Sequence, residues 1–294
     1  MRPYFIVNPI AGGGAAARNF DVVKLKLEDR GIDYDYIFTD RANQSTALAE
    51  EAYKAGERYI VAVGGDGTIN EVASALYKHK DAVMGFCPFG TGNDFARAAG
   101  MPTDPEEAAA VIMDGKPRPV DMGMAGDKPF VNIGGLGFDV DVVINTEKYK
   151  DRLHGMLPYL IGIAKSLFPL NKVPVRLVAD GKVIEETVLL LSVGNGSHFG
   201  GGIAVCPEAD PFDGYFDVCI VKKVSLIKFL TLFPLYMKGR HLGKKPVLYF
   251  KAKEVSIECE KAPMQLDGEL GEFAPTVYRI LPGALMMQLP VTES

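Results

Sequence analysis

Long apolar runs are scarce in this sequence of 294 residues, and none reaches the roughly 18–20 residues that span a bilayer. The two nearest candidates, residues 155–170 and 226–245, are both interrupted by proline and lysine. Each mixes large apolar residues with basic ones, which fits either a core-facing helix with a basic end or a helix lying against a membrane surface. The apolar stretch at the N-terminus is too short for a secretory signal and predicts a first strand.

Paired cysteines and blocks of like charge are also missing. The four cysteines are scattered and form no C-x-x-C pair, which is typical of reduced, buried thiols in a cytosolic protein. The net charge of -5 comes without a block of like charges, so the basic surface that nucleic acid requires is not expected. With 48% hydrophobic residues the chain can build a sizeable core, and its length favours about two domains.

The order of predicted elements changes near residue 121. Up to that point, strand-like runs alternate with helix-like segments, a pattern that favours a parallel sheet with helices on both faces. The strand-like runs are residues 4–8, 33–39, 59–63 and 82–88. Beyond that point strand-like runs dominate, and Asp180-Gly181 between two of them predicts a β-hairpin. We therefore expect an α/β domain over residues 1–121 and an antiparallel β-rich domain over residues 122–277.

A glycine-rich loop follows the strand predicted at 59–63. Its sequence VGGDGTINEV (63–72) places three glycines around Asp66 and a capping box, Thr68 to Glu71, at the start of a helix. The N-terminus of such a helix presents free N–H groups that favour phosphate. A lone carboxylate would repel phosphate there, so Asp66 either supports a Mg²⁺ ion between the two or only forms hydrogen bonds within the turn.

Two further glycine-rich loops follow predicted strands, NPIAGGG at 8–14 and PFGTGNDFAR at 88–97. The loop at 8–14 has neither the G-x-x-x-x-G-K-[ST] spacing of a P-loop nor the G-x-G-x-x-G spacing of a dinucleotide fold. Loops at the carboxyl ends of strands in one parallel sheet converge on one crevice, where open α/β sheets bind their ligands. The phosphates of a nucleotide are the natural occupant.

These loops, in this order and spacing, resemble the catalytic domain of the diacylglycerol kinase family, which includes bacterial lipid kinases and the sphingosine and ceramide kinases. The similarity continues in residues 121–139, 195–221 and 265–272, so nearly the whole chain is covered. The resemblance implies a Rossmann-like N-terminal domain similar to NAD kinase and phosphofructokinase, a sandwich-like C-terminal β domain and an active site in the cleft between them. It also implies that the segment 278–294 returns to the first domain.

The resemblance assigns nucleotide contacts to the three loops and to the end of the second strand. The implied ATP-binding residues are Asn8, Pro9, Ile10, Ala11, Gly12, Thr39, Gly64, Gly65, Asp66, Gly67, Thr68, Ile69, Asn70 and Thr91. Two departures from the family pattern stand out: Ala11 replaces the usual serine, and Arg18, not lysine, is the first cation after the glycines. Both departures bear on how tightly ATP binds; ATP is still expected to bind.

Three acidic residues are implied in catalysis by the same resemblance. Asp66 is implied as the carboxylate linked to the metal, and Asp267 and Glu269 match the acidic pair of the family. The glutamate of that pair is the proposed base, which takes the proton of the acceptor hydroxyl during phosphoryl transfer. On the residues alone, the D-G-E tripeptide reads more simply as a hairpin turn.

A structural magnesium site is implied in the segment ADPFDGYFDV. The resemblance places the carboxylates of Asp210 and Asp213 and the carbonyl oxygen of Tyr215 as its ligands. Two carboxylates and a carbonyl suit a hard cation that keeps several waters. A metal-free Asp-Gly turn is the alternative for this segment.

Lys148, Lys150 and Arg152 resemble the basic patch that holds the bacterial members of the family to anionic membranes. A solvated helix end is the alternative, and the negative net charge does not decide between them, because each basic residue near a membrane surface contributes about 1 kcal/mol locally. The expected partners are ATP, a lipid substrate at an anionic membrane surface and a second copy of the chain in a homodimer, with no nucleic acid. A cytoplasmic protein that associates peripherally with the membrane during catalysis is expected.

The implied function is transfer of the γ-phosphate of ATP to the hydroxyl of diacylglycerol, forming phosphatidic acid with the help of Mg²⁺. The same chemistry on phosphatidylglycerol, a sphingoid base or undecaprenol stays open, because pocket shape selects the acceptor. NAD kinase shares the G-G-D-G turn, but Asn70-Glu71 and the GTGNDFAR loop favour a lipid kinase. A non-catalytic lipid or nucleotide sensor is the last alternative, against which the intact Asp66 and D-G-E tripeptide argue.

Overall fold

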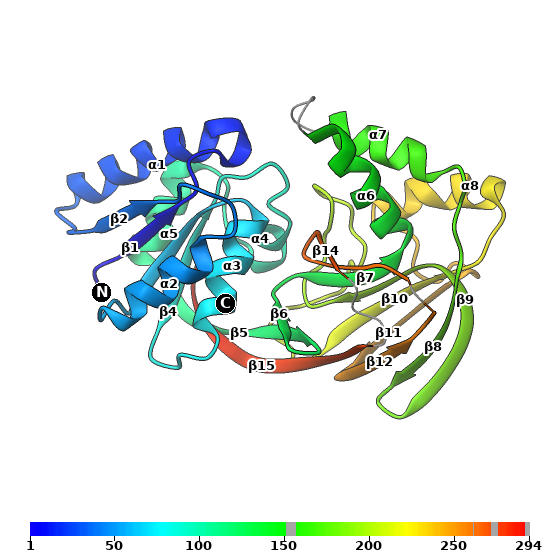
Figure 1. Ribbon diagram of the computed structural model, residues 1–294. Helices are drawn as coiled ribbons and strands as arrows, with labels where there is room; N and C mark the ends of the chain where they lie inside the picture. The colour runs from blue at the N-terminus through cyan, green and yellow to red at the C-terminus, as the bar shows by residue number, and fades with distance from the viewer. Residues whose placement is uncertain (151–156, 261, 272–275, 292–294) are drawn as a thin grey trace. The chain divides into compact units, whose positions relative to one another are not determined.

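The computed structural model describes residues 1–150, 157–260, 262–271 and 276–291 (Figure 1). The chain divides into two compact units. Unit 1 comprises Met1–Met122 and Pro282–Ser294, and unit 2 comprises Gly123–Leu281. Strand β15 (Thr276–Leu289) has residues in both. The expected combination of a parallel-sheet domain and an antiparallel β domain is confirmed by the strand pairing within each unit.

Unit 1 is built on a parallel sheet in the order β2-β1-β3-β4-β15. Its first four strands are β1 (Tyr4–Val7), β2 (Asp35–Phe38), β3 (Tyr59–Gly64) and β4 (Val83–Pro88). Every residue of β3 and β4 is buried, which is why these strands are continuous apolar runs in the sequence. The chain leaves β1 toward β2 and leaves β3 in the opposite direction toward β4. The carboxyl ends of β1 and β3 therefore form the switch point at which open sheets bind ligands.

The helices of unit 1 pack in pairs, α1 beside α5 and α2 beside α3, on the two faces of this sheet (Figure 1). They are α1 (Ala11–Asp29), α2 (Ser45–Lys54), α3 (Asp66–Leu76), α4 (Asp94–Ala99) and α5 (Pro105–Asp114). The inner face of α1 is formed by Phe20, Val23 and Leu27, which are fully buried. Apolar residues at this spacing form one stripe of a helix, and the stripe fixes α1 against the sheet.

The capping box predicted at Thr68 and Glu71 is wrong. Helix α3 begins at Asp66 with Gly65 as its N-cap residue, so Thr68 already lies inside the helix. The hydroxyl of Thr68 accepts a hydrogen bond from the first loop, and the carboxylate of Glu71 accepts one from the N–H of Ser45 at 2.7 Å. Both side chains are therefore used for contacts between elements, which the local sequence does not reveal.

Unit 2 consists of antiparallel strands in the order β14-β13-β7-β9-β8-β12-β15, with β10 paired to β9 and β11 paired to β10. Its strands are β5 (Lys116–Ala125), which starts in unit 1, β6 (Lys128–Phe130), β7 (Ile133–Gly137), β8 (Val173–Ala179), β9 (Lys182–Gly194), β10 (Phe216–Lys222), β11 (Val247–Ala252), β12 (Glu254–Glu258), β13 (Met264–Leu266) and β14 (Glu269–Gly271). The hairpin predicted at Asp180-Gly181 is confirmed, because β8 and β9 pair with Ala179 opposite Lys182.

Two apolar clusters form the core of unit 2. One lies among the strands and includes Phe130, Phe216 and Tyr278. The other lies between the strands and the helices α6 (Phe138–Lys150), α7 (Leu157–Ser166) and α8 (Leu226–Met237). All four cysteines are free, and Cys259 is the one that is not fully buried. In the part of the chain that the structure describes, no helix is long and apolar enough to cross a bilayer.

Candidate functional site

Three loops meet at the carboxyl ends of β1, β3 and β4 in unit 1. The first loop is tied to the second, because the N–H of Asn8 donates to the carbonyl oxygen of Val63 at 2.9 Å and its Nδ2 donates to Oγ1 of Thr68 at 3.2 Å. The second loop is tied to the third, because the N–H of Phe89 donates to the carbonyl oxygen of Gly64 at 2.8 Å. The three predicted loops thus converge within unit 1.

Glycine is required where these loops touch. A Cβ atom on Gly90 would lie 2.3 Å from Cα of Gly65, and one on Gly12 would lie 2.5 Å from the carbonyl oxygen of Phe89. Gly12 also has a φ of +59°, in the left-handed region that other residues rarely adopt. Backbone atoms rather than side chains therefore line the contacts between the loops.

Ala11 and Arg18, the expected departures in the first loop, both lie at or within the start of α1. Pro9 and Ala11 are partly exposed, and α1 begins at Ala11. The side chain of Arg18 folds back toward this loop, because a Cβ atom on Gly14 would lie 3.2 Å from its Nη1. A guanidinium group therefore lies beside the loop although no lysine follows the glycines.

The first turn of α3 has no side-chain cap among the described residues, and Gly65 is its N-cap residue. The first N–H groups of a helix have no partner inside the helix, so those of Gly67 and Thr68 keep their capacity to donate. The helix dipole adds a positive field at the same place. A phosphate group is the ligand that such a terminus favours.

Asp66 lies in this turn beside the start of α4. Its Oδ1 accepts a hydrogen bond from the N–H of Phe95 at 3.1 Å, so the carboxylate does bond within the loops. Burial raises the pKa of Asp66 and the neighbouring charge of Asp94 raises it further, while N–H groups of the third loop lower it. Two acidic groups this close favour a cation between them.

Gly92 keeps the space beside the two carboxylates open. A Cβ atom on Gly92 would lie 2.9 Å from Oδ2 of Asp66 and 3.2 Å from Oδ2 of Asp94. Carboxylate oxygens are ligands that Mg²⁺ prefers, so these residues fit the expected ion. Within the described ranges no group of three His, Cys, Asp or Glu side chains would hold a metal. Water and phosphate oxygens would have to complete the coordination, as is usual for Mg²⁺.

The sequence reasoning did not include Asp94 among the site residues. Its position as the first residue of α4, in the Asn-Asp pair of the third loop, was the available signal. The carboxylate of Asp94 also pairs with the guanidinium of Arg97 at 3.1 Å. Asp94 is almost fully buried, and its closeness to Asp66 depends on contacts between two loops that are separate in the sequence.

The remaining residues predicted to contact the nucleotide differ in exposure. Thr39 is buried at the end of β2, where its N–H donates to β1. Thr91 is exposed in the third loop, and Ile10 is 79% exposed before α1. The side chain of Ile69 is fully buried, so only its backbone is available to a ligand. Oδ1 of Asn70 is buried and has no hydrogen-bond partner among the described residues.

In unit 2, Asp267 anchors the turn between β13 and β14. Its carboxylate accepts hydrogen bonds from the N–H groups of three consecutive residues at distances of 2.8–3.3 Å. These donors are Val131, Asn132 and Ile133. Glu269, the first residue of β14, is exposed. The two acidic residues of the D-G-E tripeptide therefore have different surroundings, one held by the backbone and one open to solvent.

Gln265 connects this turn to a buried carboxylate. Its Oε1 accepts a hydrogen bond from the N–H of Gly268 at 2.9 Å, and its Nε2 donates to Oδ2 of Asp139 at 3.2 Å. Burial raises the pKa of Asp139 to about 6, and the hydrogen bond from Gln265 opposes this shift. Sequence reasoning missed Asp139, because it lies far from the tripeptide in the chain, and missed Gln265 although it lies two residues before Asp267.

Asp210, Asp213 and Tyr215, the expected ligands of a structural metal, lie in one turn. Oδ1 of Asp210 accepts the N–H of Phe212 at 3.1 Å, and Oδ1 of Asp213 accepts the N–H of Tyr215 at 2.9 Å. The other oxygen of Asp213 forms an ion pair with the ammonium group of Lys251. Positive charge is thus already present at this turn, and a metal ion on Asp213 would share its carboxylate with Lys251.

Of the basic residues compared with a membrane patch, Lys148 is exposed near the end of α6. Its Nζ donates to Oδ1 of Asn145 at 3.1 Å. Arg152 and the side chain of Lys150 lie outside the described residues. The patch therefore stays a prediction.

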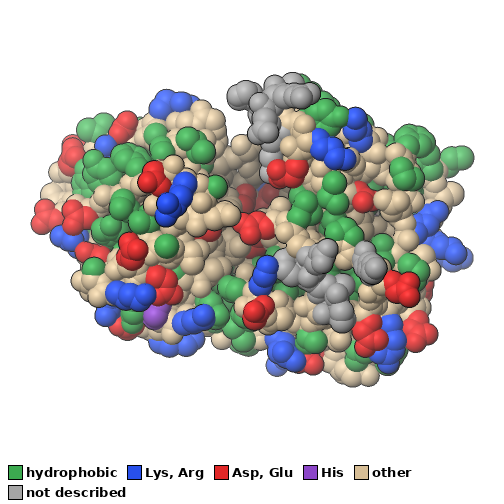
Figure 2. Space-filling view, in the orientation of Figure 1, with side chains coloured by type: hydrophobic (Ala, Val, Ile, Leu, Met, Phe, Trp, Pro, Cys, Tyr) green, Lys and Arg blue, Asp and Glu red, His purple; other side chains and the backbone are tan. Residues whose placement is uncertain are grey.

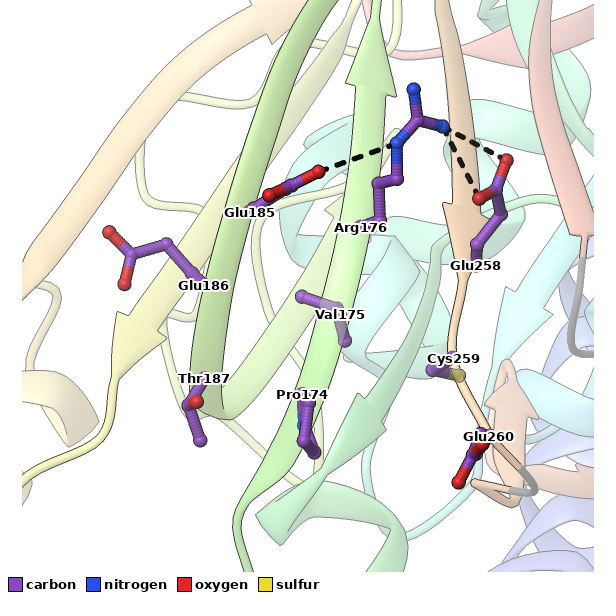
Figure 3. Close-up of a pocket in the computed structure, with 9 residues that line it drawn as sticks. All are labelled: Pro174, Val175, Arg176, Glu185, Glu186, Thr187, Glu258, Cys259 and Glu260. Carbon is purple, nitrogen blue, oxygen red and sulfur yellow. Dashed lines mark hydrogen bonds and ion pairs between the residues drawn. The ribbon is translucent and has the colours of Figure 1, made fainter.

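A separate pocket of about 800 Å³ lies on β8, β9 and β12 of unit 2 (Figure 3). It includes none of the predicted site residues. Figure 3 shows Arg176 between Glu185 and Glu258, with which it forms ion pairs at 3.6 and 3.1 Å. Glu186 and Glu260 add further negative charge to its lining, so this pocket is unsuited to phosphate.

Comparison with known proteins finds a family model for each half of the chain. The diacylglycerol kinase catalytic domain matches residues 2–125, and the YegS C-terminal NAD kinase beta sandwich-like domain matches residues 133–289. A diacylglycerol kinase from Mycobacterium tuberculosis is 33% identical over 293 residues, covering 97% of this chain and 94% of its own. The chain belongs to the diacylglycerol kinase catalytic domain family. The expected class of enzyme, a lipid kinase, is confirmed by this membership.

Two further proteins resemble the chain over nearly its full length, and a more distant kinase resembles it in fold. A probable lipid kinase YegS-like protein from Pseudomonas putida is 34% identical, covering 94% of this chain and 93% of its own. The crystal structure of a putative diacylglycerol kinase from Bacillus anthracis, 27% identical, superposes with a TM-score of 0.79 over 98% of this chain and 96% of its own. Yeast NADH kinase shares only the fold, with a TM-score of 0.56 at 11% identity over 99% of this chain and 84% of its own.

Proposed function

We propose that this lipid kinase transfers the γ-phosphate of ATP to the hydroxyl group of diacylglycerol, producing phosphatidic acid and ADP. The observation that carries the proposal is the site in unit 1, where three glycine-rich loops surround an uncapped helix N-terminus and a pair of carboxylates. Relatives named diacylglycerol kinase cover nearly the full chain, which supports diacylglycerol as the acceptor.

In this proposal the backbone of unit 1 holds the phosphates of ATP. The N–H groups of Gly67 and Thr68 donate to phosphate oxygens, and Arg18 adds a positive charge beside the first loop. Asp66 and Asp94 would hold Mg²⁺ in the space that Gly92 leaves open. When bound, such an ion neutralises the charge that phosphate oxygens carry during transfer.

Glu269 takes the proton in this proposal. The hydroxyl oxygen of the acceptor forms a bond to the γ-phosphorus, the bond between that phosphorus and the oxygen bridging to the β-phosphate breaks, and the hydroxyl proton passes to the carboxylate of Glu269. Asp267 is less suited to this role, because protonating its carboxylate would break at least one of its hydrogen bonds to β7 and the residues before it. Its role is to fix the position of the turn that carries Glu269.

The test is transfer of labelled γ-phosphate to diacylglycerol in mixed micelles. We expect Glu269→Gln to lower kcat by about 10²–10⁴-fold, the usual contribution of a general base. Asp66→Asn should abolish most activity and change the dependence on Mg²⁺ concentration. Glu260→Gln is the matched control, because Glu260 is also an exposed glutamate of unit 2 but lies outside the turn. Unchanged turnover in Glu269→Gln would refute the assignment of the base.

The identity of the acceptor needs its own experiment. The relative from Pseudomonas putida is named as a lipid kinase without a stated acceptor, so phosphatidylglycerol, a sphingoid base and undecaprenol belong in the same panel. Mass spectrometry of the phosphorylated products should show phosphatidic acid as the main product. A different main product would leave the kinase activity as proposed and would identify another lipid as the acceptor. The expected homodimer is tested separately by sedimentation velocity.

A further inference from the structure

Helix α8 of unit 2 carries apolar side chains on two opposite faces. Its inner face packs into the helix-covered core through Phe229, Leu232 and Tyr236. Its outer face carries Ile227, Leu230 and Met237, whose side chains are 78%, 48% and 39% exposed. A surface helix of a globular protein normally has polar residues on its outer face. The outer face of α8 therefore matches an apolar partner better than it matches water.

The chain around α8 is strongly basic although the whole protein is acidic. Residues 218–253 contain nine lysine or arginine residues and no aspartate or glutamate, against a net charge of -5 for the full chain. Lys222 and Lys251 form ion pairs with acidic residues of unit 2. Within the described ranges, Lys228, Lys238 and Arg240 are exposed and form no ion pair. Unpaired positive charge thus lies at both ends of the outer face.

Helix α7 also carries exposed apolar side chains. Ile163 of α7 and Phe233 of α8 line the same apolar cavity of about 20 Å³, so the two helices lie close together. Leu160 of α7 is 54% exposed, and Phe168, just after α7, is 70% exposed. In Figure 2, hydrophobic side chains and lysine or arginine side chains lie near one another at the edge where Figure 1 places α8.

We infer that the outer side of α8 docks on an anionic lipid bilayer. The docking surface, which we call the α8 face, is formed by Ile227, Lys228, Leu230, Met237, Lys238 and Arg240. A bilayer surface offers both partners that this face needs, because the apolar side chains enter the acyl boundary while the cations meet anionic headgroups. The α8 face is separate from Lys148 on α6, and its docking does not depend on ATP or on the proposed phosphoryl transfer.

The test is flotation of the full chain with vesicles in the absence of ATP. We expect binding to vesicles of phosphatidylglycerol and phosphatidylcholine in equal amounts, little binding to pure phosphatidylcholine, and weaker binding as the salt concentration rises. Ile227→Ser with Leu230→Ser should weaken binding by at least about tenfold through lost apolar burial. Lys238→Gln with Arg240→Gln should weaken it by about 30-fold, from about 1 kcal/mol for each cation.

Matched controls use side chains of the same type elsewhere on the chain. Leu25→Ser changes a leucine on α1 that is 58% exposed, and Lys172→Gln with Lys182→Gln removes two exposed cations of unit 2 outside the α8 face. Neither control should alter vesicle binding by more than about twofold, since each charge acts only within about a Debye length of the membrane. Thermal unfolding of each variant checks that it is folded.

Three results would overturn the inference. Wild-type protein that binds neither kind of vesicle is one, and it needs no variant. Double variants on the α8 face that are folded and bind as the wild type does are another. The third is a wild-type dimer that dissociates in Ile227→Ser with Leu230→Ser while vesicle binding persists, because a second copy would then cover the face. A negative phosphoryl-transfer assay would leave all three measurements unaffected.

Discussion

Replacing Gly12 by alanine tests the contact between the first and third loops of unit 1. The new Cβ atom would lie 2.5 Å from the carbonyl oxygen of Phe89, whereas ordinary contact begins at 3.4 Å, so the loops must part by about 1 Å. Overpacking of this kind costs about 1–3 kcal/mol. The left-handed backbone conformation at Gly12 adds roughly 1–2 kcal/mol for any residue with a side chain.

Gly13→Ala separates these two contributions. Gly13 has a φ of +65°, close to the value at Gly12, but a Cβ atom there would meet nothing within 4 Å. We therefore expect Gly13→Ala to lower the free energy of unfolding by the conformational term alone, and Gly12→Ala to lower it by about 1–3 kcal/mol more. Urea unfolding of both variants, compared at equal m-value, measures the difference.

Activity gives the second measurement. A displacement of about 1 Å in a positioned site can cost about 100-fold in rate, so kcat/KM for ATP should fall by about that factor in Gly12→Ala. Gly13→Ala should keep kcat/KM for ATP near the wild-type value, because Gly13 is exposed and touches neither neighbouring loop. Equal stability and equal kcat/KM in the two variants would show that the loop contact has no role in binding ATP.

Three more outcomes follow from single side chains. Arg18→Ala should raise KM for ATP by about tenfold with kcat nearly unchanged, since the guanidinium beside the first loop contributes binding; an unchanged KM would place Arg18 outside the site. Burial raises the pKa of Asp139 to about 6, so this carboxyl group stays protonated to a higher pH in the folded chain than in the unfolded chain. The free energy of unfolding should therefore fall by up to about 3 kcal/mol as pH rises from about 4 to 6, and urea titrations of Asp139→Asn should lack this fall. Burial lowers the pKa of His241, so the unfolded chain takes up the proton first and stability should fall by about 1.4 kcal/mol per pH unit below about pH 6.5; a His241→Gln variant with the same slope would refute this.

The parallel sheet of unit 1 could be predicted from the sequence, because a strand that is buried on both faces is a continuous apolar run. Strands β3 and β4 are buried along their whole length and appear as continuous apolar runs followed by glycine. The loops after them could be placed for the same reason. The hairpin at Asp180-Gly181 was equally accessible, because both residues have positive φ and the dipeptide favours that turn.

Contacts between loops could not be predicted, because they depend on the distance between strands rather than on local sequence. Thr68 and Glu71 have the spacing of a capping box, yet their side chains bond to the first loop and to α2. Asp66 and Asp94 are separated by α3, β4 and the third loop, and only the folded sheet brings the two carboxylates to the same glycine. Local patterns therefore located the site, whereas the contacts between its side chains could be found only from the tertiary structure.

In the D-G-E tripeptide, residue type alone does not distinguish the roles of the two acidic side chains. Asp267 and Glu269 carry the same functional group two residues apart, and either is an equal candidate for a base on chemistry alone. In the folded chain the carboxylate of Asp267 accepts hydrogen bonds from three N–H groups, and the N–H of Gly268 is held by Gln265. These contacts fix the turn from both sides, which leaves Glu269 exposed on a rigid support. In the proposed transfer Glu269 is the base, which must exchange its proton readily and must also be held in place, and the tripeptide would divide these two requirements between its acidic residues.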